Sequence, residues 1–156
     1  CPDCHIAGSV AVSGDNVLFG HNGNAFICVG LETGETRWIF DQSREAFFSS
    51  PAISRGRVVF GGRNKVLHCA DLETGELVWT KKTRRKIDGS SVICGDKVVF
   101  GSGDGRLYVL ALEDGEELWS YEIGESIFSS PAVDGGRILV GANDGVLYAF
   151  GPEGTR

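Results

Sequence analysis

The first five residues, Cys1-Pro2-Asp3-Cys4-His5, have a spacing that could carry redox or metal chemistry. Cys-x-x-Cys-His is the attachment pattern of haem c, in which two thiols add to the haem vinyl groups and the histidine binds iron. The same residues could form half of a zinc site, which would need a further ligand such as His21. Lipid modification of Cys1 and a plain loop with no ligand are two further interpretations of these residues. The sequence alone therefore leaves haem, zinc, lipid or nothing open at Cys1, Cys4 and His5.

A second candidate site is a run of five cations in six residues: Lys81, Lys82, Arg84, Arg85 and Lys86. The chain as a whole is acidic, with a formal net charge of −6. Like charges at this density repel one another, so the run must stay solvated and gains from a bound anion. We expect these residues, together with Arg63, to form a face for a phosphate, a carboxylate or an acidic protein segment. The alternative is a solvated loop that binds nothing.

Of the three other cysteines, two are predicted to be core residues. Cys28 and Cys69 occupy the same place in an internal repeat, where the other copies have Val109 and Ala149. Apolar replacements predict buried thiols, and equivalent positions on neighbouring units lie too far apart for a disulfide. Cys94 has no predicted partner. Unpaired thiols favour a reducing compartment.

Composition and charge exclude several classes of function. The net charge of −6 argues against a general nucleic-acid-binding protein, which needs a basic face for the phosphates. No apolar stretch approaches the ~20 residues that cross a bilayer, so we expect no transmembrane segment. Glycine accounts for 23 of the 156 residues, which suits many short strands joined by tight turns.

An internal repeat predicts the architecture. Trp38, Trp79 and Trp119 are spaced by 41 and 40 residues. Three copies align without gaps up to a tryptophan and a fourth stops short of one: 16–38, 57–79, 97–119 and 137–156. Each copy holds short segments rich in Val, Ile, Phe and Tyr, separated by turn residues. Four strands in a period near 40 residues predict an all-β fold, a β-propeller of four-stranded antiparallel blades. We expect one module, 1-156, with blades at about 8-43, 49-83, 89-123 and 129-156.

The motif Gly-x-Leu-Tyr-x-Leu, then Thr-Gly-x-x-x-Trp, with Ser-Ser-Pro-Ala opening the next copy, resembles the PQQ-like propeller repeat. The resemblance spans nearly the whole chain, from about Gly8 to Gly154. It implies that each Trp docks on the neighbouring blade and is received by a Thr-Gly turn. The docking residues implied here are Trp38, Trp79, Trp119, Gly34, Gly75 and Gly115. The family's Asp before this turn survives only as Asp71, so we expect its docking bond to be lost at Gly30, Ala111 and Gly151.

The resemblance covers both quinone dehydrogenases and non-catalytic relatives such as the outer-membrane barrel-assembly lipoprotein. The dehydrogenases that share this repeat hold calcium and PQQ in a complete ring of blades. Those that oxidise alcohols also have a disulfide between adjacent cysteines. This sequence has no Cys-Cys pair and only four repeats. We therefore expect a non-catalytic scaffold or binding module without PQQ. The alternative is part of a redox protein, with haem c at Cys1–His5 or with a quinone in a ring completed by another half.

A chain of four blades, the last one incomplete, predicts half of a larger ring. The edge of blade four and the outer side of blade one would be uncovered, and such edges seek partners. We expect a protein partner and either self-association or completion of the ring by another chain or a missing half. Two chains of this kind would give about eight blades. The family resemblance implies a periplasmic or cell-envelope location.

Overall fold

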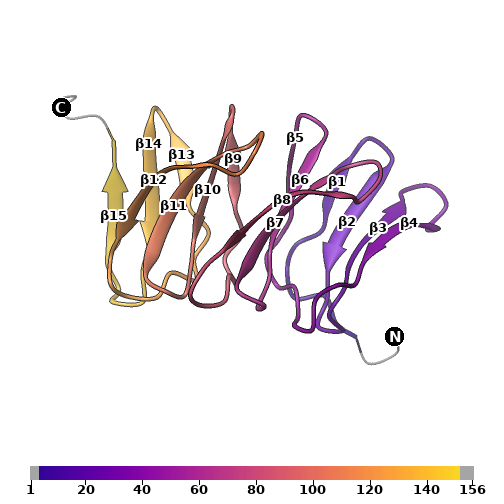
Figure 1. Ribbon diagram of the computed structural model, residues 1–156, viewed down its shortest axis with the longest axis horizontal. Coiled ribbons are helices and arrows are strands. Elements are labelled where there is room, and N and C mark those ends of the chain that lie inside the picture. Colours follow the sequence, from indigo (N-terminus) through magenta and orange to yellow (C-terminus); the bar gives the residue numbers. More distant parts are fainter. Residues whose placement is uncertain (1–3, 152–156) are drawn as a thin grey trace.

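The computed structural model describes residues 4–151, and within them all strands belong to four antiparallel sheets. The sheets follow one another along the chain and stand side by side as the blades of an open arc (Figure 1). Strands pair in chain order within each sheet, so every blade is an up-and-down meander. The sequence-based prediction of an all-β, partial propeller of antiparallel blades is therefore confirmed.

The strands of blade one are β1 (Ala11–Ser13), β2 (Asn16–Gly20), β3 (Phe26–Gly30) and β4 (Thr36–Phe40). Those of blade two are β5 (Ala52–Ser54), β6 (Arg57–Gly61), β7 (Val66–Asp71) and β8 (Leu77–Lys82). Those of blade three are β9 (Val92–Cys94), β10 (Lys97–Gly101), β11 (Arg106–Ala111) and β12 (Glu117–Glu122). In the part of the chain that is described, blade four has β13 (Ala132–Asp134), β14 (Arg137–Gly141) and β15 (Leu147–Phe150).

Turn chemistry sets the hairpins. The turn between β5 and β6 has positive φ at Arg55 (51°) and Gly56 (71°), the combination of a type I′ turn, whose twist matches that of the two strands. In each four-stranded blade the register between the third and fourth strands shifts once, as at Cys69/Ala70 in blade two. Such a bulge twists the outer strand and re-aims its side chains.

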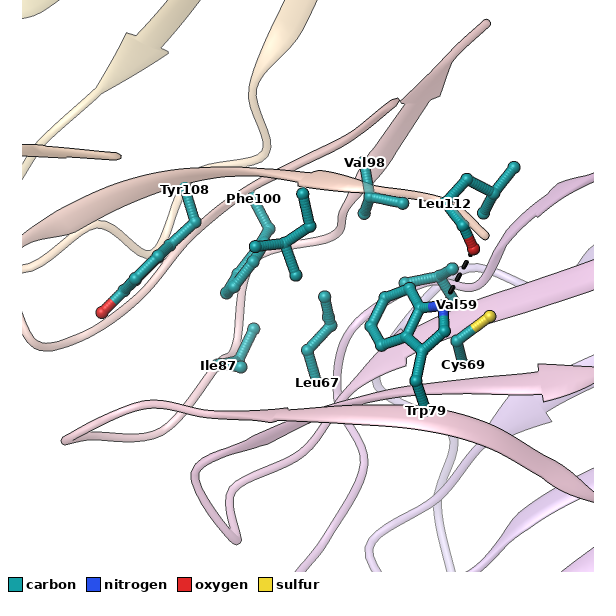
Figure 2. Packing of buried hydrophobic residues seen from close by; sticks show 10 residues of the cluster. Val59, Leu67, Cys69, Trp79, Ile87, Val98, Phe100, Tyr108 and Leu112 are labelled. Carbon is teal, nitrogen blue, oxygen red and sulfur yellow. Dashed lines mark hydrogen bonds between the residues drawn. The ribbon is translucent and has the colours of Figure 1, made fainter. Parts of the chain in front are cut away.

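The core lies between the blades. Figure 2 shows the interface of blades two and three, where Val59, Leu67 and Cys69 face Val98 and Phe100 of the next blade. Equivalent apolar clusters join blades one and two and blades three and four. Each blade is therefore held mainly by its neighbours, as in other repeat architectures.

Among residues 4–151 three thiols are free: Cys28 and Cys69 are fully buried, and Cys94 is exposed. Burial raises the pKa of Cys69 to about 12 and also raises the pKa of Cys28. Because the reactive form of cysteine is the thiolate, these two groups pack as small apolar side chains. The interpretation of Cys28 and Cys69 as core residues agrees with this packing.

Candidate functional site

Three residues in the loops between blades anchor each blade on the one before it. We call Phe47, Ile87 and Ile127 the anchor residues; all three are fully buried. Their backbone N–H groups donate to the carbonyls of the preceding blade, at 3.3, 3.1 and 3.1 Å. Each packs against the glycine that ends a second strand, where a Cβ would overlap the anchor side chain: Gly20, Gly61 and Gly101. Sequence reasoning missed the anchors, although their spacing of about 40 residues was a usable signal.

A ladder of serine hydrogen bonds joins the segments that lead into the first strand of each blade. The N–H of Ser9 donates to Ser50 Oγ at 2.9 Å, the N–H of Ser50 donates to Ser90 Oγ at 2.8 Å, and the N–H of Ser90 donates to Ser130 Oγ at 3.0 Å. Every bond runs from one blade to the next in the same direction. The Ser pairs were predicted only to open strands, so their role between blades is new information.

The tryptophans dock through a backbone acceptor. Trp79 Nε1 donates to the carbonyl of Leu112 at 2.8 Å, and Trp38 Nε1 donates to the carbonyl of Leu72 at 3.0 Å. The expected loss of a docking bond at Ala111 is wrong for the indole, because the acceptor is the main chain of the following residue. Asp71 instead accepts bonds from the backbone of its own turn and pairs with Arg57 at 3.0 Å.

Glycine receives each docked indole. A Cβ on Gly75 would lie 2.6 Å from Trp38, and a Cβ on Gly115 would lie 2.7 Å from Trp79. Both glycines also have positive φ, of 74° and 75°, which disfavours any side chain. Gly34 shares the positive φ, but a Cβ there would meet open space, so it receives no tryptophan within the described residues.

Trp119 departs from the prediction that all three tryptophans are largely buried. It is 38% exposed, against 8% for Trp79. Its ring packs on Phe150 at 5.3 Å between centroids and on Tyr121 at 6.1 Å. The position in blade four that corresponds to Leu112 is residue 152, which lies outside the described residues.

Three of the six cations that were predicted to form the basic face pair with carboxylates. Lys81 pairs with Glu117 at 2.7 Å. The Asp88 carboxylate pairs with Lys86 Nζ at 2.6 Å. It also accepts two hydrogen bonds from the Arg63 guanidinium, from Nε at 3.0 Å and from Nη2 at 3.1 Å. Lys81 therefore links the outer strands β8 and β12, whereas Arg63 and Lys86 link the neighbouring loops that meet at Asp88.

The other three cations of the face are Lys82, at the end of β8, and Arg84 and Arg85, on the loop that follows; we call this segment the basic loop. Lys82, Arg84 and Arg85 are exposed, and none of them joins a salt bridge within residues 4–151. The loop itself is held by the Arg84 N–H, which donates to Asp104 Oδ2 at 2.9 Å, and by the Thr83 N–H, which donates to the Lys65 carbonyl at 2.8 Å. A shallow depression beside it is lined by Lys81, Lys82, Thr83, Arg84, Arg106, Tyr108 and Glu117.

The loops between blades and the turns between second and third strands share one face. The bond from the Asn22 N–H to the His5 carbonyl, at 3.2 Å, is one of several that join the two kinds of loop. This face lies along the lower side of Figure 1. His5 and the basic loop around Arg84 therefore belong to the same surface of the arc.

At the N-terminus the structure describes Cys4 and His5, whereas Cys1 lies outside the described residues. Cys4 is disulfide-bonded. Its sulfur can bind zinc or add to haem only after the disulfide is reduced to a thiol. Cys4 Sγ and the His21 ring both flank Gly23. In the described part of the chain, no group of three or more His, Cys, Asp or Glu side chains could hold a metal ion. Haem, zinc and lipid at Cys1, Cys4 and His5 stay predictions.

A buried histidine lies between blades one and two. His68 is 4% exposed and stacks on Phe60 with ring centroids 5.2 Å apart. Its Nε2 contacts Asn64 Nδ2 at 3.1 Å, but its buried Nδ1 has no hydrogen-bond partner in the part of the chain that the structure describes. Burial lowers the pKa of His68 to about 4, so the ring is neutral at pH 7. Tyr108 holds the equivalent place in blade three and donates to Asp104 at 3.0 Å.

Repeated docking between four-stranded blades, with anchors, serines and tryptophans at equivalent places, defines a β-propeller repeat module. Residues 5–150 match the family described as outer membrane protein assembly factor BamB. Because this match covers most of the chain, the protein belongs to that family. No curated protein sequence matches it. Among the described residues, no helix has the length and apolar character to cross a membrane.

Solved structures with the same fold differ in function. BamB from Moraxella catarrhalis is 22% identical, with a TM-score of 0.83 over 94% of this chain and 46% of that one. The computationally designed Ika4 protein is 17% identical, with a TM-score of 0.83 over 94% of this chain and 91% of that one. A quinohemoprotein alcohol dehydrogenase from Comamonas testosteroni is 16% identical, with a TM-score of 0.78 over 88% of this chain and 29% of that one. This chain thus spans about half the length of the Moraxella protein.

Proposed function

We propose that this chain is a non-catalytic propeller scaffold that binds an acidic segment of a protein partner. Support comes chiefly from the basic loop, where Lys82, Arg84 and Arg85 are exposed and lie outside every salt bridge among the described residues. The backbone bonds of Thr83 and Arg84 hold this loop in place before a ligand arrives. A pre-ordered loop loses less conformational entropy on binding, which favours affinity.

The chemistry of the loop favours carboxylates on an extended peptide. Arginine donates two parallel hydrogen bonds to a carboxylate, and two arginines with a lysine beside them can hold successive acidic side chains. The rest of the chain is acidic, with a net charge of −6, so a second acidic protein is attracted to this loop and repelled elsewhere.

Family membership supports a location in the cell envelope. The family is described as an outer membrane protein assembly factor, and we propose that this chain works in the periplasm, on a protein partner. Completion of the open arc by further blades, from another chain or another part of the same polypeptide, belongs to the same proposal.

Binding of a fluorescent Glu-rich peptide to the chain tests this function. We expect the anisotropy of the peptide to rise on titration at low salt, and the affinity to fall as salt is added. The Debye screening length falls from about 10 Å at 0.1 M salt to about 3 Å at 1 M, and this weakens contacts between exposed charges. A peptide that does not bind at low salt, or binds equally well at high salt, would contradict the proposal.

A further inference from the structure

The fourth strand of blade two ends its sheet with an open edge. The first strands of neighbouring blades contact one another, so β8, at the other end of the sheet, lies at the outer rim of the arc. Blades one and three flank blade two, so additional blades do not cover this rim. Within residues 4–151, β8 pairs only with β7, and no main-chain hydrogen bond leaves its other edge. Such an edge presents N–H and C=O groups that can pair with an added strand.

Side chains along this edge alternate between two environments. Trp79 is buried against blade three, and Lys81 reaches a carboxylate of the same blade. Val78, Thr80 and Lys82 are exposed. Successive residues of a strand point to opposite faces, so these three share the free face of β8. An added strand would therefore meet an apolar, a hydroxyl and a basic side chain in that order.

Charge separates the edge of β8 from the two equivalent edges. The strands β4 and β12 also end their sheets. However, β12 begins at Glu117 and ends at Glu122, which repel an acidic segment. The segment after β4 has Asp41 and Glu45 beside a single cation, Arg44. Of the three edges, only that of β8 runs directly into the basic loop.

The direction of an added strand follows from the same arrangement. Every strand pair of blade two is antiparallel, so we expect an added strand to run antiparallel to β8. Its first half would then lie beside Arg84, Arg85 and Lys82, and its second half beside Val78. Opposite charges and pairs of β-branched side chains stabilise neighbouring strands. The edge therefore selects a segment that is acidic first and β-branched afterwards.

We propose that the acidic segment of the partner binds as a fifth strand of blade two, antiparallel to β8, with its acidic N-terminal half beside the basic loop and its β-branched half beside Val78. The inference rests on the proposed function, because it describes how the segment that the basic loop attracts is held. Main-chain hydrogen bonds to the edge supply affinity, and side chains on both halves set the direction.

N-methylation of a labelled peptide, acetyl-Glu-Glu-Glu-Thr-Val-Thr-Ile-amide, tests the main-chain pairing by fluorescence anisotropy at low salt. One form is methylated on the nitrogens of both threonines, and the other on those of the valine and the isoleucine. Neighbouring N–H groups of a strand point to opposite edges, so only one form loses the N–H groups that face β8. We expect that form to bind at least tenfold more weakly than the parent peptide, and the other to stay within threefold. Equal effects of the two methylations would overturn the inference.

A peptide of the same composition with its acidic half last tests the direction. It should bind at least fivefold more weakly, because its acidic and β-branched halves cannot both meet their partners in an antiparallel strand. An affinity equal to that of the parent peptide would overturn the antiparallel arrangement.

Matched variants of the chain test which edge is used. Val78 and Leu118 hold equivalent places on β8 and β12 and are 40% and 47% exposed, so a charge at either should leave the fold intact. Val78→Glu should weaken binding of the parent peptide at least fivefold, whereas Leu118→Glu should change it less than twofold. An effect of Val78→Glu no larger than that of Leu118→Glu would contradict the assignment to β8.

The Glu-rich peptide separates this inference from the proposed function. If the Glu-rich peptide binds and the two methylated forms do not differ, only the inference fails. If neither the Glu-rich peptide nor the parent peptide binds at low salt, the proposed function fails with it.

Discussion

The indole Nε1 of Trp79 lies 2.8 Å from the carbonyl oxygen of Leu112 in the next blade. The acceptor belongs to the main chain, so the bond is independent of which residue precedes the turn. The six-membered part of the same indole covers Gly115, where a side chain would collide with it. One tryptophan, one glycine and one carbonyl thus form a unit of docking that each blade can repeat.

The first prediction compares two tryptophans at equivalent places. Trp79→Ala should lower the free energy of unfolding by about 3–5 kcal/mol, because it removes a buried ring and its hydrogen bond. Trp119→Ala should cost less than half as much, because Trp119 is 38% exposed. Urea melts of the two variants measure both values. Equal losses would show that exposure in the structure does not report the docking of these rings.

The second prediction concerns the glycine that contacts an anchor residue. Gly101→Ala should destabilise the chain by about 1–3 kcal/mol, the usual cost of an added methyl group in a packed core. The reason is that a Cβ at Gly101 overlaps Ile127. Thermal melts should show a lower midpoint for this variant than for the wild type. An unchanged midpoint would mean that the anchor can move aside without cost.

The third prediction is a pH dependence from the buried histidine. The pKa of His68 falls to about 4 in the folded chain, from an ordinary value of 6.5. Between these pH values the unfolded chain binds more protons, so stability is fully present above pH 6.5 and declines as the pH falls toward 4. The loss from His68 approaches about 3 kcal/mol, at roughly 1.4 kcal/mol for each pKa unit.

Chemical denaturation at several pH values should reveal this slope, and His68→Phe should remove most of it. His21, whose pKa is also lowered by burial, would supply a smaller remainder of the same sign. A wild type equally stable at pH 4.5 and pH 7 would show that His68 is protonated without penalty in the folded chain.

The fourth prediction concerns cofactors. We expect the purified chain to bind no PQQ and to oxidise neither alcohols nor aldoses, since it has no adjacent cysteines and only four repeats. Dye-reduction assays with PQQ and calcium measure the activity, and the visible absorption spectrum reports haem. Stoichiometric quinone binding with turnover, or a haem band in the native protein, would restore the redox alternative.

How far the sequence predicted this molecule depends on the kind of contact. The spacing of Trp38, Trp79 and Trp119 was sufficient for the fold, because a period near 40 with four short strands has few other solutions. The anchor residues and the serine ladder were missed, because their partners are backbone groups and glycines in another blade. The spacing of the anchors by about 40 residues marks them as repeat positions, but it does not show which groups they contact.

The same limit applied to the candidate site. A run of like charges predicted a solvated basic loop, and Lys82, Arg84 and Arg85 fit that description. The sequence could not tell that Arg63 pairs with Asp88, because the two residues lie on different turns, 25 residues apart in the chain. Exposure of Trp119 was equally out of reach, since it depends on contacts made one blade further on.

The central claim is that the basic loop binds an acidic partner segment, and matched charge reversals test it most directly. The variant Arg84→Glu with Arg85→Glu is compared with Arg55→Glu with Lys97→Glu, which changes the net charge equally on exposed residues at the opposite ends of the strands. Titration of the Glu-rich peptide at low salt should show at least tenfold weaker binding for the first variant and a change of less than threefold for the second. Equal affinities for the two variants would contradict the account.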